Sequence, residues 1–259
     1  MMLGRAISMF DAEGVVGVVL AGGEGKRLRP LTYYFQKCMI PVGSCQKPLL
    51  EYILVHLRRH GIVDAKLLVG YKHEQIVNYF NDGSRFGVRI RYFVDDPSLG
   101  GSGGALLNAA AKGAFEDDNT LLVYYGDILS DIDLSKMVEQ HVESGSAATL
   151  AMTNGYSVPV GVAEVEGRVI RGWVEKPRID VYAGIGVVAL SPVALGALKE
   201  LAVGKEMVDV MSDLVPFLLD RGEGVEAYLT DAFWYDVGST ERYEKIDNGL
   251  IDELFNLSA

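Results

Sequence analysis

The sequence predicts an α/β fold whose core is an open, mixed and mainly parallel sheet flanked by helices. In the first half of the chain, short runs of β-branched and apolar residues alternate with stretches of helical periodicity, which is typical of parallel strands joined by helices. After Ser146 the predicted strands follow one another without intervening helices. This change predicts a small antiparallel lobe added to the parallel sheet.

The first half of the chain alternates between the two kinds of element. Continuous apolar runs predict buried strands, and Leu50, Ile53 and Leu57 mark the apolar face of the first predicted helix. The predicted strands span residues 15–20, 65–69, 88–94 and 121–125, and the predicted helices span residues 49–59, 74–80 and 104–111.

The second half begins with three short strands and ends with helices. The short strands are predicted over residues 147–152, 160–165 and 169–174, and a longer strand is predicted over 183–190. Pro192 can open the next helix because proline is tolerated in a first turn. Two further helices, 208–219 and 240–254, bracket a strand at 225–229. Residues 1–14 are interpreted as an N-terminal extension and residues 15–259 as a single domain.

Composition narrows the class of protein. The chain has 259 residues, of which 49% are apolar, and 24 Lys and Arg against 35 Asp and Glu give a net charge of −11. Such an acidic chain lacks the surplus cations that bind nucleic-acid backbones. Cys38 and Cys45 make neither a disulfide framework nor a metal quartet, and the apolar runs are shorter than the roughly 20 residues of a membrane helix. We expect a cytoplasmic enzyme with no nucleic-acid or membrane partner.

A glycine-rich, basic segment directly follows the first predicted strand. Its backbone amides can face phosphate oxygens, and Lys26, Arg27 and Arg29 supply opposing charge. A Walker A motif is excluded because Gly25-Lys26 lacks a following Ser or Thr. A dinucleotide-binding fingerprint fits poorly because Pro30 lies where its helix should continue, which disfavours a dehydrogenase. Anion binding is favoured over an ordinary exposed turn because the segment lies where open α/β sheets bind ligands.

Motifs along most of the chain resemble those of the sugar-phosphate nucleotidyltransferases, also called nucleotide-sugar pyrophosphorylases. LAGGEGKRLRPLT, at residues 20–32, is similar to the family's triphosphate-wrapping signature. Further similar motifs follow in family order: KCMIPV at 37–42, LGGSGGAL at 99–106, GD at 126–127, VEKP at 174–177, AGI at 183–185 and WYDVG at 234–238. The resemblance implies a Rossmann-like, GT-A-like nucleotidyltransferase fold with a small antiparallel sugar-binding lobe. We expect no C-terminal left-handed β-helix, because no hexapeptide repeat follows residue 245.

The resemblance also implies a reaction and a set of site residues. A nucleotidyl group would pass from a nucleoside triphosphate to a sugar 1-phosphate, with Mg²⁺ as cofactor and pyrophosphate as the second product. Arg27, Lys37 and Asp127 would be catalytic, and Asp127 and Asp236 would hold the metal. The nucleotide would contact Leu20, Ala21, Gly22, Gly23, Gly25, Lys26, Asp96 and Gly101, and the sugar phosphate would contact Gly161, Glu175, Lys176 and Tyr182.

The chemistry of that reaction explains why no paired nucleophile and base is needed. A sugar phosphate has a second pKa near 6, so it is already largely dianionic at pH 7 and can attack without a general base. The difficulty is to bring two polyanions together, which calls for fixed cations. Carboxylate oxygens such as those of Asp127 and Asp236 suit Mg²⁺.

The identities of the base and of the sugar are predicted from fewer residues than the reaction is. Asp96 lies near the position where family members that select thymine or uracil commonly place Gln, and a carboxylate can accept from guanine N1–H and N2–H₂. This favours GTP, with mannose 1-phosphate as the sugar substrate, although Asp96 could equally cap a turn. Glucose-1-phosphate thymidylyl or uridylyl transfer stays open, as does a non-catalytic regulatory homologue that binds NDP-sugars, because Lys26 and Tyr182 depart from the family pattern. A homo-oligomer is also compatible with the sequence.

Two histidines are interpreted without a functional role. His56 and His60 lie four residues apart on a predicted helix, but the sequence between them lacks the Glu of a zinc-protease motif. We expect both to be ordinary histidines on the helix surface.

Overall fold

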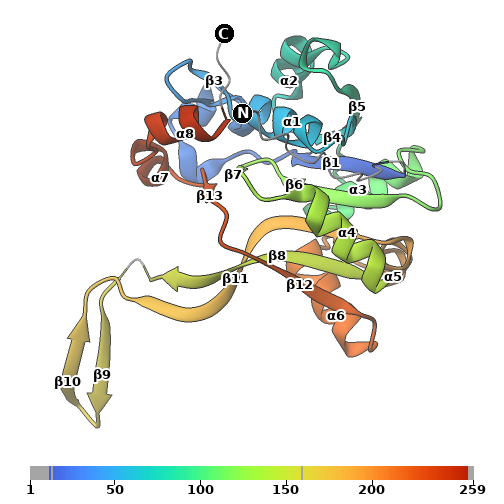
Figure 1. Ribbon diagram of the computed structural model, residues 1–259. Coiled ribbons are helices and arrows are strands. Elements are labelled where there is room, and N and C mark those ends of the chain that lie inside the picture. The colour runs from blue at the N-terminus through green and yellow to red at the C-terminus, as the bar shows by residue number, and fades with distance from the viewer. Residues whose placement is uncertain (1–11, 13, 159, 256–259) are drawn as a thin grey trace, which may run out of the picture.

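A seven-stranded mixed sheet crosses the molecule in the computed structural model, which describes residues 12, 14–158 and 160–255 (Figure 1). In spatial order its strands are β12 (Val225–Thr230), β8 (Ala148–Ser157), β11 (Arg178–Leu190), β6 (Thr120–Tyr125), β1 (Val15–Ala21), β4 (Asp64–Val69) and β5 (Arg89–Val94). Four neighbouring pairs are parallel: β6 with β1, β1 with β4, β4 with β5, and β12 with β8. The predicted open and mainly parallel mixed sheet is confirmed. The N-terminal extension expected over residues 1–14 lies almost wholly outside the described residues.

Helices cover both faces of this sheet. The apolar core on one face includes residues of α1 (Leu49–Arg59), α2 (His73–Phe80), α4 (Leu134–Ser144) and α8 (Asn248–Phe255). The core on the other face includes residues of α3 (Gly101–Ala111), α5 (Pro192–Leu201) and α6 (Val215–Asp220). Val15 and Val19 of β1 pack on the first face, and Val16 and Val18 pack on the second. Burial on both faces explains the continuously apolar sequence of β1.

Short paired strands complete the architecture. β2 (Pro41–Val42) pairs with β3 (Lys47–Pro48), and β7 (Ile128–Ser130) pairs with β13 (Trp234–Asp236). A further helix, α7 (Thr240–Glu244), follows β13, and a single π-helical turn at Val210–Leu214 precedes α6. Within the described part of the chain, none of the helices combines the length and the apolar character needed to cross a membrane.

The antiparallel region is organised around a projecting hairpin. β8 and β11 are antiparallel to each other but belong to the main sheet, which they join through β6. β9 (Val162–Glu166) and β10 (Val169–Val174) form a two-stranded hairpin that extends away from the body of the molecule (Figure 1). The small antiparallel lobe is therefore present as this hairpin, together with the ends of β8 and β11 that lead into it.

The helix that periodicity predicts over residues 240–254 is two helices, α7 and α8, so that prediction was wrong. The Ser239 hydroxyl accepts from the Arg242 amide at 3.3 Å, and the Asp247 carboxylate accepts from the Leu250 amide at 3.0 Å. Each acceptor is an N-cap, so the chain begins a helix twice. Periodicity also missed α4, whose first turn is capped by Asp133 accepting from the Lys136 amide at 3.1 Å.

The expectation that His56 lies on the surface was also wrong. Its side chain is buried, and its ring lies beside Tyr124 and Phe255. The Nε2 atom donates to the Ile132 carbonyl at 2.9 Å, which fixes a neutral tautomer. Burial is the main cause that lowers the pKa of His56 to about 3. His56 points inward because α1 packs against β7 and α8 as well as against the sheet. The periodicity of the α1 sequence does not reveal these contacts with distant segments.

The pKa of His56 predicts an acid-sensitive stability. In the unfolded chain the imidazole takes up a proton near pH 6.5, whereas the folded protein excludes that proton down to about pH 3. The neutral imidazole of His56 therefore makes its full contribution to the free energy of unfolding above pH 6.5, and this contribution is lost as the pH falls toward 3. Between pH 7 and pH 5 the wild-type protein should lose about 2 kcal/mol more unfolding free energy than His56→Gln. Urea unfolding of both proteins at the two pH values measures this difference, and identical losses would contradict it.

Candidate functional site

A cavity of about 590 Å³ lies at the carboxyl ends of the parallel strands. This is the edge at which open α/β sheets bind ligands. Of the predicted nucleotide contacts, Leu20, Ala21, Gly22, Gly23 and Gly101 line the cavity, as do the predicted catalytic residues Lys37 and Asp127. Its other lining residues are Glu24, Gln36, Cys38, Leu68, Asp95, Ser102, Ala105, Tyr125 and Met207.

The glycine-rich turn after β1 forms one wall and continues outward. Gly25 has a left-handed φ of +63°, and its carbonyl accepts from the Thr32 hydroxyl at 2.9 Å, which closes the turn. Lys26 and Arg27 follow on an exposed 3₁₀ turn outside the lining of the cavity. Glu24 pairs with Lys26 at 3.3 Å and with Arg29 at 3.6 Å, so part of the basic charge of the turn is already balanced.

Gln36 anchors the turn to the end of β1. Its side chain is fully buried, and its Nε2 donates to the Ala21 carbonyl at 2.7 Å while its Oε1 accepts from the Cys38 amide at 2.5 Å. These bonds place Lys37 at the cavity wall. Cys38 is buried, and burial raises the pKa of its thiol to about 12, so this cysteine is not a nucleophile.

Lys37, Asp127 and Asp236 form the charged centre of the site. The Lys37 ammonium donates to the Asp127 carboxylate. Asp127 follows β6, and its backbone carbonyl accepts from the Val237 amide at 2.8 Å. This hydrogen bond brings the neighbouring residue, Asp236, beside Asp127. Arg242 of α7 donates to Asp236 Oδ2 at 2.6 Å. Burial, and then the charge of Asp127, raise the pKa of Asp236 against the opposing effect of Arg242 and the smaller effects of Lys37 and Arg27.

The two acids fit a divalent cation. Asp236 Oδ1 is buried and has no hydrogen-bond partner in the described part of the chain. An unpartnered buried carboxylate oxygen beside a second carboxylate is a donor set that Mg²⁺ prefers. Two protein carboxylates, completed by water and phosphate oxygens, are the usual complement of a Mg²⁺ site at a nucleotide. Asp127 and Asp236 therefore remain the residues that could hold the metal.

The second glycine-rich loop closes the opposite wall. Gly101 begins α3 with a φ of +85°, and a Cβ there would lie 2.3 Å from the Val208 carbonyl oxygen. The Ser102 hydroxyl donates to Asp209 at 2.9 Å and accepts from the Val210 amide at 2.9 Å. Only glycine allows this close approach, so the loop fixes the start of α3 against the segment before α6.

Asp95, rather than Asp96, faces the cavity. Asp95 lines it, and its Oδ1 is buried without a hydrogen-bond partner among the described residues. Burial raises the pKa of Asp95, and Lys112 opposes that effect. Asp96 is exposed and accepts from the Ser98 amide at 2.8 Å, which is the turn-capping alternative. The strand ends one residue before Asp95, so that Asp95 turns inward and Asp96 outward.

The predicted sugar-phosphate residues lie outside the cavity lining, on or beside the projecting hairpin. Gly161 packs so closely on Trp173 that a Cβ would overlap the indole ring. Glu175 and Lys176 follow β10 and are exposed, and Tyr182 is exposed on β11. The pKa of Glu241 on α7 is lowered mainly by Lys245 and, to a smaller extent, by Lys176. The structure does not bring the four residues together at the cavity.

Several site residues lie outside any motif that sequence reasoning identified. Gln36, Asp209 and Arg242 shape or charge the site through contacts with distant segments. Ser102 lies within the motif at residues 99–106, but no role was predicted for it. Gln36 directly precedes a recognised motif and could have been found from that position. Asp209 and Arg242 carry no local signal, because their partners lie far away in the sequence.

Replacing the two glycines that follow β1 with alanine should affect stability differently. A Cβ at Gly22 would lie 1.9 Å from Asp95 Oδ2, whereas a Cβ at Gly23 would meet nothing within 4 Å. Gly22→Ala should lower the unfolding free energy by about 1 to 3 kcal/mol, because Asp95 must move from a tightly packed position. Gly23→Ala is the matched control and should change it by less than about 0.5 kcal/mol. Denaturant unfolding measures both, and equal stabilities would show that the Asp95 contact is loose.

The geometry first defines a broad class of protein. A glycine-rich turn at the carboxyl edge of an open sheet, with a lysine and two adjacent carboxylates, is the arrangement of an α/β protein that binds phosphorylated ligands. The profile of the family described as nucleotidyl transferase matches residues 16–253, and the chain belongs to this family. The expected family membership is thus confirmed.

Similar proteins carry several substrate names. The chain is 33% identical to a UTP–glucose-1-phosphate uridylyltransferase of Synechocystis sp., over 90% of this chain and 63% of that protein. It is 31% identical to a mannose-1-phosphate guanylyltransferase of Mycobacterium tuberculosis, over 88% of this chain and 62% of that protein. A solved structure of a putative glucose-1-phosphate thymidylyltransferase from Bacillus anthracis matches with a TM-score of 0.73 and 26% identity, over 93% of this chain and 99% of that one. The chain therefore spans less than two thirds of the two sequence relatives.

Proposed function

We propose that this protein transfers a nucleotidyl group from a nucleoside triphosphate to a sugar 1-phosphate. The observation that carries the proposal is the charged cluster of Lys37, Asp127 and Asp236, of which Lys37 and Asp127 line a cavity walled by two glycine-rich loops. The related uridylyl-, guanylyl- and thymidylyltransferases support the same type of reaction.

The reaction has a simple balance of bonds. An oxygen of the sugar 1-phosphate forms a bond to the α-phosphorus, and the bond from that phosphorus to the bridging oxygen breaks. Pyrophosphate leaves with the bonding electron pair, so no protein group has to accept a proton from the attacking dianion. Catalysis then consists of positioning the two substrates and stabilising charge on phosphoryl oxygens.

Each charged residue has a role in that scheme. Lys37 lies against Asp127, and it would hold the phosphate oxygens of the two substrates together at the centre of the site. Arg27, on the exposed turn, would reach the β- and γ-phosphates when the turn closes over the triphosphate. Arg242 holds Asp236 in place through its 2.6 Å ion pair. Mg²⁺ held by Asp127 and Asp236 would neutralise charge on the phosphoryl oxygens.

We infer guanine as the base from the chemistry of Asp95. A buried carboxylate oxygen without a partner is unfavourable until a ligand donates to it. Guanine offers two adjacent donors, N1–H and N2–H₂, whereas adenine offers an acceptor at N1, and uracil and thymine flank a single N–H with carbonyl acceptors. GTP therefore satisfies Asp95 best. Mannose 1-phosphate is proposed as the sugar substrate through the resemblance to guanylyltransferases of that sugar.

A coupled pyrophosphate-release assay tests the proposal. The full-length chain with Mg²⁺ is given each of GTP, dTTP, UTP, ATP and CTP with mannose 1-phosphate or glucose 1-phosphate. The highest kcat/KM is expected for GTP with mannose 1-phosphate. Preference for UTP or dTTP with glucose 1-phosphate would establish the alternative transfer reaction. Binding of an NDP-sugar in calorimetry without turnover of any pair would establish a regulatory homologue instead.

A further inference from the structure

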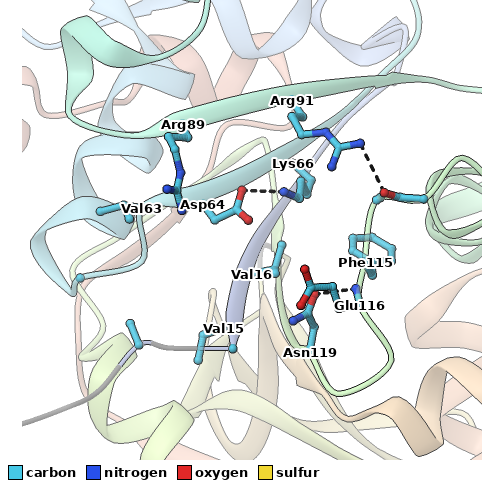
Figure 2. Close-up of a pocket in the computed structure, with 15 residues that line it drawn as sticks. Val15, Val16, Val63, Asp64, Lys66, Arg89, Arg91, Phe115, Glu116 and Asn119 are labelled. Atoms are coloured by element: carbon cyan, nitrogen blue, oxygen red, sulfur yellow. Dashed lines mark hydrogen bonds and ion pairs between the residues drawn. The ribbon is translucent and has the colours of Figure 1, made fainter.

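A second cavity lies at the opposite edge of the sheet from the candidate site. It has a volume of about 570 Å³ and lies at the amino ends of β1, β4 and β5 (Figure 2). The loop after α3, residues 113–119, forms another wall, and Gly61 and Val63 contribute from the segment before β4. That volume falls within the range of small-molecule sites. None of the residues proposed above for nucleotidyl transfer lines this cavity.

The cavity exists because α3 does not cover the whole length of the strands. The helix ends at Ala111, and the chain then turns away through Gly113, which has a φ of +71°. The amino-terminal halves of β4 and β5 are left without a helix on this face. Asp64 pairs in register with Arg89, and Lys66 pairs with Arg91, so strand alternation puts all four side chains on the same face.

These side chains leave an excess of positive charge. Lys66 is only 4% exposed, and its Nζ donates to Asp64 at 2.6 Å, which leaves two of its three donors for another partner. Arg89 lines the cavity, and its guanidinium has no hydrogen bond or ion pair in the described part of the chain. Arg91 donates to the Gly113 carbonyl at 3.3 Å, a neutral partner.

The acidic groups do not balance this charge. Asp64 neutralises one of the three cations, and Glu116 on the loop is an exposed carboxylate that also lines the cavity. Among the lining residues one cation therefore stays uncompensated, in a chain whose net charge is −11; Asp117 and Asp118 of the same loop are exposed and lie outside the lining. A recess with two guanidinium groups and an ammonium favours a doubly charged oxyanion, which guanidinium groups bind in a bidentate manner.

Part of the remaining lining is apolar, and it also includes the polar side chain of Asn119. Val15, Val16 and Phe115 face the cavity from the side opposite the cations (Figure 2). A ligand with a phosphate at one end and an apolar or ring-shaped face at the other complements both halves of the cavity. We propose that this cavity is a second ligand site, which binds the phosphate of a small phosphorylated molecule through Arg89, Arg91 and Lys66.

The strands connect this site physically with the candidate active site. β1 contributes Val16 to this cavity and Leu20 to the other, and β4 contributes Lys66 here and Leu68 there. β5 contributes Arg91 here, and Asp95 follows its other end. A phosphorylated ligand at the amino edge therefore contacts the same strands that carry the proposed nucleotide contacts.

Calorimetric titration of the full-length chain tests this second site without any turnover. Inorganic phosphate, mannose 1-phosphate and guanosine monophosphate are titrated separately, in the absence of divalent metal. The wild-type protein should show two sites for a phosphate ligand. Arg89→Gln/Arg91→Gln should weaken one of them by at least tenfold, and Lys37→Met should weaken the other. The control Arg168→Gln/Arg171→Gln removes the same charge from the β9–β10 hairpin and should retain both.

The outcomes distinguish this proposal from the proposed transferase function. A single site that depends on Lys37 and is unchanged in Arg89→Gln/Arg91→Gln would overturn the second site, whatever the catalytic activity. Equal affinity for the three probes would identify free phosphate as the ligand, and tighter binding of an ester would identify a phosphorylated metabolite that uses the apolar wall. Tungstate soaked into crystals should give anomalous density between Arg89 and Lys66, and density confined to the Lys37 cavity would contradict the proposal.

Discussion

Replacing Asp127 with asparagine should lower kcat/KM for pyrophosphate release by roughly 10³-fold, or about 4 kcal/mol of transition-state stabilisation. The substitution keeps the size of the side chain but removes the charge that faces Lys37. It also removes one of the two carboxylates that could hold Mg²⁺. Both changes weaken the stabilisation of phosphoryl charge, so the effect should appear mainly in kcat. Steady-state kinetics with the preferred substrate pair measure it.

Asp131→Asn is the matched control for this experiment. Asp131 is an exposed aspartate just after β7, so its replacement makes the same change of charge close to the site but outside the cavity lining. We expect activity within about twofold of wild type, a difference within the ±0.5 kcal/mol of ordinary surface substitutions. Activity of Asp127→Asn close to that of the control, with an unchanged urea midpoint, would rule out the proposed role of Asp127.

Asp95→Asn should remove the preference for GTP. The amide offers one donor and one acceptor, so it cannot accept both guanine donors as the carboxylate does. We expect kcat/KM for GTP to fall roughly 10- to 100-fold, which corresponds to the loss of a bidentate contact to a base. The value for UTP should stay constant or rise, because a side-chain amide can pair with an N–H and a carbonyl of the base. Competition between GTP and UTP measures the change directly.

Asp96→Asn provides an internal comparison at the neighbouring position. Asp96 is exposed and caps a turn through Ser98, so its replacement should leave base preference unchanged. A change in base preference in Asp96→Asn but not in Asp95→Asn would assign the base contact to Asp96.

The base preference of the wild-type protein should also depend on pH. Because burial raises the pKa of Asp95, the carboxylate that accepts from guanine exists above that raised pKa and is lost as the pH falls through it.

Much of the central sheet could be predicted from the sequence because β1, β4 and β6 are buried on both faces. The continuous apolar run of β1 and the periodicity of α1 each reflect burial that repeats along a single element. The prediction failed where the cause was not local. His56 is buried by packing of α1 on distant segments, and α8 begins where the Leu250 amide donates a capping hydrogen bond to Asp247.

The sequence by itself determined the buried strands of the parallel part of the sheet, the glycine-rich turn after β1 and the acids and lysines of the recognised motifs. Those features depend on residue type and spacing. Only the tertiary structure decided which of two adjacent acids faces the cavity, which arginine holds Asp236, and that Arg89, Arg91 and Lys66 line a second recess. Strand register and the end of α3 bring these side chains together across wide separations in sequence. Contacts of this kind arise from packing between elements and leave no periodic signal in the chain.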